Sequence, residues 1–486
     1  MKYRALPAND PQVFDILAGE GQREAEGLEL IPSENYVSEA VLEALGSLFT
    51  NKYSEGTPGR RYYGGQTYTD QIETLAIERA KALFGCDHAN VQPLSGAAAN
   101  LCVYAAWLDI GDTVLAMDLS HGGHLTHGAP VTFAAKAFKF IRYKMKNIET
   151  GKIDYDHLEA LALEHKPKII LAGFSAYPRE LNYGRMARIA EKVGAVAMAD
   201  MAHIAGLIAG KALANPFEHG FHVMTTTTHK TLRGPRGAMI LSRGKAGNPL
   251  RAPEKTIENL PTLIDRAVFP GLQGGPHMHQ IAAIAVALKE AAAPAFRVYA
   301  QQVLKNAKAL AEALLERKCT LITGGTDNHL MLIDTMKSFG KSGKDVQETL
   351  ESVGITLNKN AIADDPLPPF QASGVRLGTP CATTRGMREP EMERIAGWIV
   401  EACGPNPDLA RLRKEVKALC VRFPTPSGLV EADTPAPHGK GRAASAGKSQ
   451  HSKPQHSRSQ QSKAVKHAKS ARKAGRLKAA KGKRNR

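Results

Sequence analysis

The sequence predicts an α/β protein that has a large domain with a mostly parallel sheet, a smaller α+β domain and a charged tail. Between about residues 85 and 245, short apolar runs alternate with helical patterns, as they do where the strands of a parallel sheet are buried on both faces. A long helical stretch at 278–318 follows, and shorter strand and helix patterns continue to about residue 421. The change of pattern separates the two domains.

The strands of the large domain are predicted at runs of apolar residues. Such runs lie at 113–117, 168–172 and 195–199. Between the last two, 186–192 has helical spacing and ends before Gly194, a residue suited to a helix C-cap. Ligands of parallel sheets bind beyond the carboxyl ends of the strands. We therefore expect functional residues directly after these strands.

The second half of the chain also shows patterns that predict strands and helices. The long helical stretch should break near Pro294, and strands are predicted at 330–333, 355–357 and 375–377, with a helix near 344–353. We divide the chain into five parts, namely an N-terminal arm (1–60), a large domain (61–277), connecting helices (278–318), a small domain (319–423) and a tail (424–486).

The positive charge of the chain is concentrated in the tail. The 486 residues carry a formal net charge of +17, but 434–486 holds sixteen Lys and Arg and no acid, so the remainder is almost neutral. Because the tail has almost no large apolar residue, it cannot bury enough surface to fold, and we expect it to be disordered. Two interpretations stay open: a solubilising appendage, or a segment that attracts nucleic acid or another polyanion without sequence specificity.

Nothing in the sequence predicts a membrane-bound or secreted protein. No apolar run reaches the roughly 18 residues of a membrane span, and residues 1–4 are not followed by the apolar core of a signal peptide. The six cysteines include no C-x-x-C pair, which predicts reduced thiols rather than disulfides or a zinc site. We therefore expect a cytoplasmic protein.

Three features that follow predicted strands point to one cofactor. A Ser-Gly-Ala loop at 95–97 opens a helix, where free backbone N–H groups can bind phosphate. Asp200 follows another strand, with His203 three residues on, and a Thr-rich strand runs directly into Lys230. Each alone has an ordinary explanation: a common βα turn, a helix N-cap, a solvated lysine. Together they supply the three anchors of pyridoxal phosphate, namely a phosphate cradle, a carboxylate for the pyridine nitrogen and an amine for the Schiff base.

A glycine-rich segment at 121–128 carries three histidines, His121, His124 and His127. No nearby acid or cysteine completes a metal site, and the spacing does not match a zinc pattern. We predict no metal here. An imidazole stacked on a flat cofactor ring is the better functional interpretation.

Several stretches, in a fixed order, carry a resemblance to a known family. They include Leu-Ile-Pro-Ser-Glu-Asn at 30–35 and Phe-Pro-Gly-Leu-Gln-Gly-Gly-Pro at 269–276. The others lie at 51–56, 61–65, 121–128, 173–177, 200–203, 225–230 and 376–380. Over roughly residues 8–422 the sequence resembles serine hydroxymethyltransferase. The resemblance implies an aminotransferase-like fold (pyridoxal-phosphate fold type I), a homodimer, and transfer of the hydroxymethyl carbon between serine and tetrahydrofolate, leaving glycine.

By motif position, the resemblance also implies roles at the cofactor. Lys230 would form the Schiff base, Asp200 would pair with the pyridine nitrogen, and His124 would stack on the ring. His203 and Ser175 would lie near the phenolic oxygen of the cofactor. The implied phosphate site combines the 95–97 loop with residues of the neighbouring subunit, in full Ser95, Gly96, Ala97, Tyr53, Gly274 and Gly275.

Further roles concern the two substrates. Arg376 and Ser33 would take the carboxylate of the amino acid, and Thr227 would assist the exchange of amines on the cofactor. Glu55 and Tyr63 belong, with Tyr53, to the segment that family members lend to the neighbouring subunit, and Glu55 would handle a proton at the hydroxymethyl or folate end. The implied folate contacts are Leu119, Gly123, Asn360 and Phe370.

The sequence departs from the family pattern at two places. Ala97 stands where a serine is common, which removes one hydroxyl donor from the phosphate loop. Residues 367–369, just before Phe370, read Leu-Pro-Pro where Lys-Ser-Pro is common.

Two other functions are compatible with parts of the sequence. An aldolase for β-hydroxy amino acids would need Lys230, Asp200 and Arg376 but neither Glu55 nor Asn360. A nucleic-acid-associated protein would use the tail as its working part and catalysis would be secondary.

Overall fold

The computed structural model of the chain describes residues 2–428 and 431–432. At the two limits of this region, β1 (Lys2–Tyr3) pairs in parallel with β17 (Glu431–Ala432), which lies within the predicted tail. Residues 424–428 of that tail are also described, whereas 429–430 and 433–486, on which the expected disorder and polyanion binding mainly fall, lie outside the described residues. Among the described helices, none is long and apolar enough to cross a membrane.

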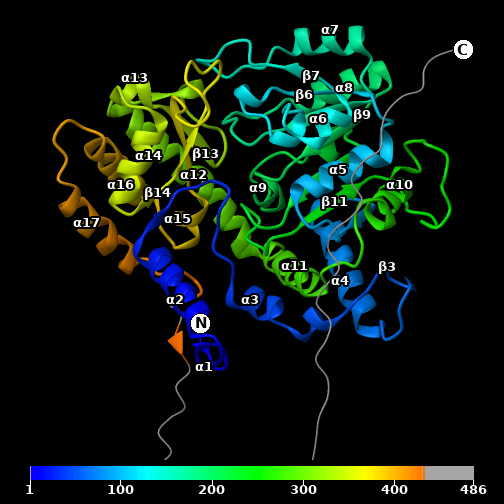
Figure 1. Cartoon of the computed structure of the whole chain (residues 1–486). Helices are drawn as coiled ribbons and strands as arrows, with labels where there is room; N and C mark the ends of the chain where they lie inside the picture. The colour runs from blue at the N-terminus through cyan, green and yellow to red at the C-terminus, as the bar shows by residue number, and fades with distance from the viewer. Residues whose placement is uncertain (1, 429–430, 433–486) are drawn as a thin grey trace, which may run out of the picture. The chain divides into compact units, whose positions relative to one another are not determined.

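A seven-stranded, mostly parallel sheet forms the centre of residues 61–277, for which we keep the name large domain (Figure 1). One strand, β11 (Ala238–Ser242), runs antiparallel to the two strands beside it, and all the other neighbouring strands are parallel. The strands, in their order across the sheet, are β5 (His88–Asn90), β11 (Ala238–Ser242), β10 (Val223–Thr227), β9 (Val196–Asp200), β8 (Ile169–Gly173), β6 (Thr113–Met117) and β7 (Lys139–Tyr143). The strands predicted at 113–117, 168–172 and 195–199 are confirmed, the last two shifted by one residue.

Helices cover both faces of this sheet, as the uninterrupted apolar strands predict. Successive side chains of β6, β8 and β9 alternate between two separate apolar cores. One core includes α4 (Thr67–Phe84) and α8 (Tyr183–Val193), and the other includes α5 (Gly96–Trp107) and α10 (Leu260–Arg266). The predicted C-cap of α8 is confirmed, because Gly194 adopts a left-handed conformation with φ of 69°.

A four-stranded antiparallel sheet with its own apolar core lies within residues 319–423, for which we keep the name small domain. Its strands, in order, are β12 (Thr320–Leu321), β13 (Leu330–Asp334), β16 (Gly374–Gly378) and β15 (Asn358–Asn360). Its helices are α13 (Thr335–Phe339), α14 (Gly343–Ser352), α15 (Pro380–Thr384), α16 (Glu389–Ala402) and α17 (Leu409–Arg422). The elements predicted at 330–333, 344–353 and 375–377 are confirmed.

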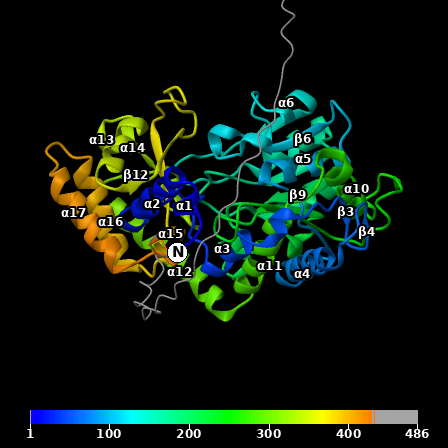
Figure 2. The same cartoon turned by 60° about the horizontal axis from the view of Figure 1, so that its bottom comes forward.

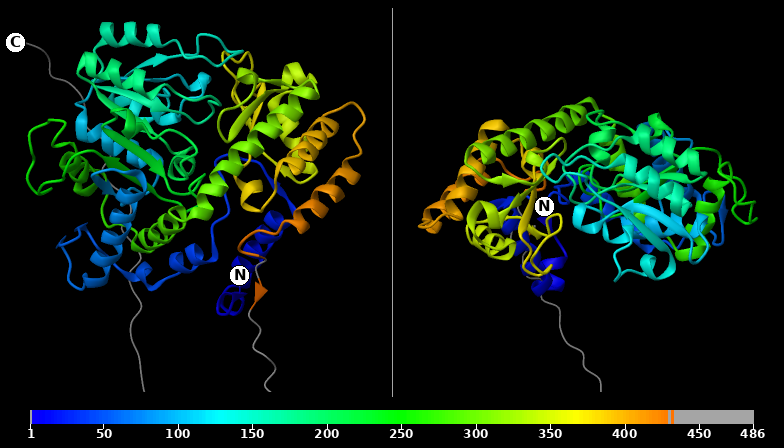
Figure 3. Two further views of the ribbon diagram at one scale, coloured as in Figure 1. Left: turned by 180° about the vertical axis from the view of Figure 1, so that it is seen from behind. Right: turned by 90° about the horizontal axis from the view of Figure 1, so that it is seen from above.

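Two consecutive helices lead from the large domain to the small one, and Figure 3 shows from behind how the second extends between them. They are α11 (Met278–Ala291) and α12 (Pro294–Glu316). The predicted break is confirmed, since Pro294 is the first residue of α12, where a missing backbone N–H costs no hydrogen bond.

The N-terminal arm contacts both domains (Figure 2). It contains α2 (Pro11–Glu26), β2 (Leu28–Glu29) and α3 (Glu39–Leu45). β2 pairs in parallel with β14 (Ile355–Thr356), so the strand predicted at 355–357 exists but joins the arm rather than the small-domain sheet. α3 packs against α11. The arm therefore places the residues that follow β2 at the junction of the two domains.

Besides short 3-10 and π-helical segments, several short or peripheral α-helices and strands remain. They are α1 (Leu6–Asn9), β3 (Gly56–Thr57), β4 (Arg60–Arg61), α6 (Phe133–Ala137), α7 (Tyr155–His165) and α9 (Ala205–Ala209). All six cysteines are free and buried, and burial raises the pKa of each thiol.

Candidate active site

A cleft of about 330 Å³ lies at the carboxyl ends of β8, β9 and β10, where the parallel sheet predicts a ligand site. The start of α5, strand β16 of the small domain and the N-terminal arm complete its wall. Of the residues predicted for the site, eleven line this cleft: Ser33, Ser95, Gly96, Ala97, His124, Ser175, Asp200, His203, Thr227, Lys230 and Arg376.

Lys230 follows the end of β10 and brings a primary amine into the cleft. Burial lowers the pKa of Lys230 to about 8, and the positive charges of Arg376 and Arg236 act in the same direction, against the attraction of Asp200. About a tenth of this amine is therefore neutral, and nucleophilic, at pH 7.

Asp200, the last residue of β9, is a buried carboxylate with three hydrogen-bond donors. Its Oδ2 accepts from His127 Nε2 at 3.1 Å and Asn100 Nδ2 at 2.8 Å, and its Oδ1 accepts from the backbone N–H of Ala202 at 3.1 Å. Burial alone would raise its pKa, but the hydrogen bonds and the neighbouring imidazoles, including His124, hold the pKa of Asp200 well below its usual range. Asp200 is thus ionised at neutral pH.

Asn100 and His127 contact Asp200 but were not predicted as site residues. Asn100 is a buried polar residue inside the otherwise apolar helix α5, which is the signal that could have found it. His127 was considered only as a metal ligand. His124, His127 and Asp200 do bring potential ligand atoms within 4.8 Å of one another, but the ring Nδ1 atoms and both carboxylate oxygens already make hydrogen bonds.

The start of α5 forms one end of the cleft. The Ser95 side chain caps the helix by accepting from the N–H of Ala98 at 3.3 Å. A Cβ on Gly96 would lie 2.9 Å from Cγ2 of Thr227, so close packing of helix and strand explains the glycine. The first N–H groups of a helix have no intrahelical acceptor, and they add to the positive end of the helix dipole, which makes this end of the cleft suitable for phosphate.

Three histidines beside the cleft are held neutral. Burial is the main cause in each case, and it lowers the pKa of His124 to about 4, that of His229 to about 3 and that of His203 well below its usual value. His203 Nδ1 lies 3.2 Å from Nε2 of His329, a buried histidine of the small domain that was also not predicted. Neutral imidazoles can contact a flat ring or share a proton without adding charge to the cleft.

Arg376 enters the cleft from β16 of the small domain. It donates to Asn358 Oδ1 at 3.1 Å, to the carbonyl oxygen of Ser175 at 2.6 Å and to Ser33 Oγ at 3.5 Å. Burial lowers the pKa of Arg376 to about 10, so the guanidinium stays charged. Residues of both domains and of the arm thus meet at one cation.

The remaining predicted residues do not line this cleft. Five of them form a second cluster: Tyr53 Oη lies 3.3 Å and Tyr63 Oη 3.5 Å from the Glu55 carboxylate, and the two rings are 5.1 Å apart. Cβ atoms on Gly274 and Gly275 would lie within 3.4 Å of Glu55 and Tyr53. Both tyrosines are about half exposed, 56% and 46%. The predicted folate residues Leu119, Gly123, Asn360 and Phe370 also lie outside the lining, and Phe370 is 85% exposed.

Four further residues line the cleft without having been predicted: Phe174, Ala202, His229 and Arg236. His229 directly precedes Lys230 and Arg236 follows it closely, so their positions beside the predicted lysine could have identified them. Phe174 and Ala202 are buried apolar neighbours of predicted residues.

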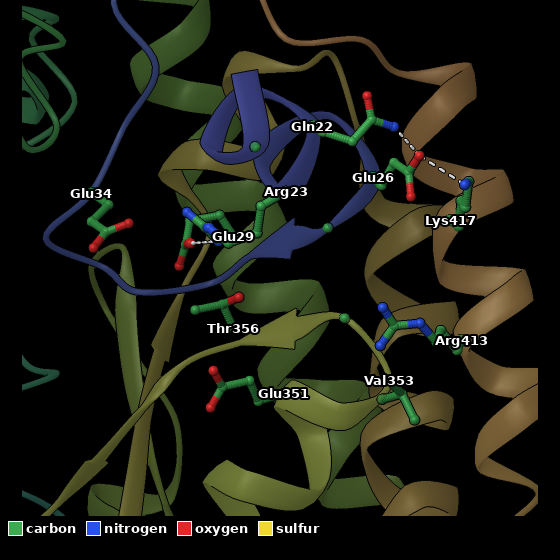
Figure 4. Close-up of a pocket in the computed structure, with 13 residues that line it drawn as sticks. Gln22, Arg23, Glu26, Glu29, Glu34, Glu351, Val353, Thr356, Arg413 and Lys417 are labelled. Atoms are coloured by element: carbon green, nitrogen blue, oxygen red, sulfur yellow. Dashed lines mark hydrogen bonds and ion pairs between the residues drawn. The ribbon is translucent and has the colours of Figure 1, made fainter. Parts of the chain in front are cut away.

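A larger cavity, of about 550 Å³, lies between α2, β14 and α17 (Figure 4). Glu29 and Glu34 lie on one side of it, and Arg413 and Lys417 on the other. Glu29 is 5% exposed; burial and the charge of Glu34 raise its pKa to about 8. None of the residues predicted for the site lines this cavity.

The chain matches known proteins over most of its length. A family model described as serine hydroxymethyltransferase matches residues 6–399. A serine hydroxymethyltransferase of Koribacter versatilis (strain Ellin345) is 53% identical over 424 residues, which cover 87% of this chain and 96% of that protein. The family model extends over nearly all of the arm, the large domain and most of the small domain, including every lining residue of the cleft. The chain therefore belongs to the serine hydroxymethyltransferase family.

Proposed function

We propose that the chain transfers the hydroxymethyl carbon between serine and tetrahydrofolate, leaving glycine, with pyridoxal phosphate held in the cleft at the sheet edge. The observation that carries this proposal is the meeting of the Lys230 amine, the ionised Asp200 carboxylate and the start of α5 in one cleft. Family membership favours this transferase over a folate-independent aldolase. It also implies the aminotransferase-like fold that we assign to the large domain.

The residues of the cleft fit pyridoxal phosphate. Ser95, Gly96 and Ala97 would hold the phosphate through backbone N–H groups, and Asp200 would hold the pyridine nitrogen. When bound, the cofactor supplies an electron sink for the electron pair released at the α-carbon of the amino acid. Ala97 lacks the hydroxyl that is common in the family, so backbone donors must carry more of the phosphate contact.

Lys230 would hold the cofactor covalently, and its lowered pKa supports this role because only a neutral amine is a nucleophile. The hydrogen bonds that keep Asp200 ionised would let it keep the pyridine nitrogen protonated, since a carboxylate stabilises a cation in a buried site. His124 would present its neutral ring to the cofactor, and His203 and Ser175 would lie near the phenolic oxygen. Thr227, at the end of β10, would assist the exchange of amines.

The substrate carboxylate would bind to Arg376 and Ser33. A guanidinium meets both oxygens of a carboxylate in one plane, which orients the amino acid as well as binding it. Because Arg376 lies on the small domain and donates to the carbonyl of Ser175 in the large domain, this contact would also fix the two domains relative to each other.

We infer a homodimer in which each site uses residues of both subunits. The cluster of Tyr53, Glu55 and Tyr63, with Gly274 and Gly275, supports this because its polar groups are partly exposed and do not line the cleft of their own chain. In the partner's site, Tyr53 and the two glycines would contact the phosphate, and Glu55 would handle a proton at the hydroxymethyl or folate end. Leu119, Gly123, Asn360 and Phe370 would contact the folate.

The reaction is tested by following serine and tetrahydrofolate to glycine in the wild type and in Lys230→Ala. The wild type should turn over only with both substrates, and its absorbance with glycine should gain a long-wavelength band that requires folate. Lys230→Ala should lose activity and the covalent link to the cofactor that borohydride reduction fixes in the wild type. A variant that keeps a reducible link would show that another amine holds the cofactor.

The shared site is tested by mixing two inactive variants, Lys230→Ala and Tyr53→Ala. A hybrid dimer would carry one site with both residues intact, so mixing should restore activity that neither parent has. Native mass spectrometry would confirm that hybrids form. Hybrids without recovered activity would contradict a site built from two subunits.

We further propose that the protein is cytoplasmic.

We also propose that the tail binds polyanions without affecting catalysis. The uneven distribution of charge along the chain supports this, with sixteen basic residues and no acid in 434–486. A chain truncated after residue 433 should keep its activity and lose salt-sensitive retention on heparin, as should a control in which Gln replaces the basic residues of a full-length tail. The slope of log affinity against log salt should be about −0.9 per phosphate contacted on duplex DNA. Lost turnover after truncation, or no retention of the full-length protein, would contradict the proposal.

A further inference from the structure

We propose that Asn100 and Thr126 form a buried relay that fixes the two ring-contacting groups of the cleft, the Asp200 carboxylate and the His124 imidazole, in a single hydrogen-bonded arrangement. The proposal rests on the function proposed above for Asp200 and His124. Asn100 and Thr126 act through those two residues, and are therefore positioning residues rather than catalytic ones.

The amide of Asn100 has no freedom to turn. Its oxygen accepts from Thr225 Oγ1 at 2.6 Å, and its nitrogen donates to Asp200 Oδ2 and to Thr126 Oγ1, each at 2.8 Å. Asn100 is fully buried, and Thr225 and Thr126 are nearly so. A flipped amide would place its N–H₂ group against the Thr225 hydroxyl and its oxygen against the carboxylate, so the network admits only one orientation.

The hydroxyl of Thr126 has an equally defined direction. Its oxygen accepts from Asn100, and it lies 2.7 Å from Nδ1 of His124. The backbone N–H of Thr126 also donates to this Nδ1, at 3.2 Å. Since Nδ1 receives an N–H, it must be the unprotonated nitrogen, and the hydroxyl proton of Thr126 is donated to it. The ring proton of His124 is therefore on Nε2.

The same reasoning fixes His127. The backbone N–H of His124 donates to Nδ1 of His127 at 3.1 Å, which leaves the ring proton of His127 on Nε2, directed at Asp200 Oδ2 at 3.1 Å. Oδ2 thus has two donors, while Oδ1 has one, the N–H of Ala202. A carboxylate accepts about four hydrogen bonds, so the remaining capacity of Asp200 lies on Oδ1, the oxygen that the relay leaves free to accept from a cationic N–H.

The relay connects four segments of the large domain: Asn100 lies on α5, Thr126 in the turn Leu125–His127, Asp200 at the end of β9 and Thr225 on β10. Loss of the Thr126 hydroxyl would leave an Asn100 N–H without an acceptor and His124 Nδ1 without its shorter donor. The expected consequence is a mobile Asn100 amide, a weaker hold on Oδ2 and a His124 ring that can rotate or exchange tautomers.

The test uses Thr126→Val, which keeps the shape of the side chain and removes the hydroxyl. We expect the dissociation constant for pyridoxal phosphate to rise about tenfold and kcat to fall by a similar factor, the size of one buried hydrogen bond, with KM for serine changed less than twofold. The pH at which the absorbance of the bound cofactor changes should shift, because the carboxylate that holds its ring nitrogen is less firmly placed. Thr126→Ser, which restores the hydroxyl, should return all three quantities to wild-type values.

Thr335→Val is the matched control. Thr335 is a fully buried threonine of the small domain whose hydroxyl also donates one hydrogen bond, to the carbonyl of Ser373 at 2.9 Å. It should leave cofactor affinity, kcat and the absorbance midpoint unchanged. If Thr126→Val does not fold, Thr225→Val provides the same test from the other end of the relay, since it frees the Asn100 oxygen and should shift the midpoint in the same direction.

Asp200→Asn separates failure of this proposal from failure of the proposed function. If Asp200→Asn alters the cofactor spectrum but folded Thr126→Val or Thr225→Val retains wild-type affinity and midpoint, the relay is overturned and the role of Asp200 stands. If Asp200→Asn leaves the spectrum unchanged, the role proposed for Asp200 at the cofactor is contradicted. The relay proposal, which depends on that role, is then contradicted as well.

Discussion

Two buried carboxylates of this chain, Asp200 in the cleft and Glu29 in the larger cavity, respond in opposite ways to similar burial. Three hydrogen-bond donors and nearby imidazoles hold the pKa of Asp200 well below its usual range. Glu29 accepts from the N–H of Ile31 at 3.0 Å, but Arg23 is 3.5 Å away and Glu34 adds a like charge, so its pKa rises to about 8. The number of donors, more than burial, decides which carboxyl group is charged.

The two carboxyl groups therefore have different expected effects on the protein. In the cleft, hydrogen bonds keep a negative charge ready for a cationic partner. In the cavity, Arg23 donates two hydrogen bonds to Glu20, at 2.7 and 2.8 Å, which leaves only its long contact for Glu29. The cleft residues should therefore control activity, and the cavity residues should control stability as a function of pH.

The largest effect should come from Asp200→Asn, which removes the charge and keeps the shape. The variant should fold, yet kcat should fall at least a hundredfold, because electrostatic contributions of this kind are worth about 3 kcal/mol or more. Steady-state kinetics and circular dichroism of the same sample would check this. Near-normal turnover in the variant would show that the charge of Asp200 does not control activity.

The next effect concerns how Lys230 takes up the cofactor. With a pKa of about 8, its neutral fraction rises from about 1% at pH 6 to about half at pH 8. The rate at which the cofactor-free protein attaches pyridoxal phosphate should therefore rise about fiftyfold over this range and level off above pH 8. Stopped-flow absorbance would measure it. A rate that continues to rise tenfold per unit up to pH 10 would show an unperturbed lysine.

The smallest effect on activity should come from Glu29→Gln, whose effect is on stability. A carboxyl group whose folded pKa lies above its unfolded value destabilises the fold as pH rises, starting near the unfolded value of about 4.3 and ending near 8. The variant should lose this dependence and gain about 3.5 kcal/mol on the wild type between pH 5 and pH 8, with kcat unchanged. Denaturant unfolding at both pH values would test it. A gain that is equal at pH 5 and pH 8 would contradict a neutral buried Glu29.

Much of the large domain could be predicted because its signals are local. Apolar runs gave β6, β8 and β9 to within one residue, and Gly194 and Pro294 mark the ends of helices through their own backbone chemistry. The pairing of β14 with β2 was not predicted, because the residues it joins are more than 300 positions apart and neither strand indicates its partner.

The residues that face the cleft were easier to predict than the residues that lie behind them. Eleven of the fifteen residues that line the cleft could be taken from motifs, whereas Asn100 and His329 contact site residues without lining the cleft and leave no motif of their own. The cluster of Tyr53, Glu55 and Tyr63 is a different case, since the role proposed for it lies in the site of a second subunit. Its role stays a prediction until hybrid dimers are measured.

The burial of all six cysteines has a practical consequence. With raised pKa values and little access to solvent, these thiols should react slowly with maleimide or iodoacetamide reagents. A single cysteine introduced by Phe370→Cys, at a side chain that is 85% exposed, would therefore be the preferred target of a thiol-reactive dye in the otherwise wild-type protein. Fluorescence from that position would report directly whether folate reaches this loop, without first removing any native cysteine.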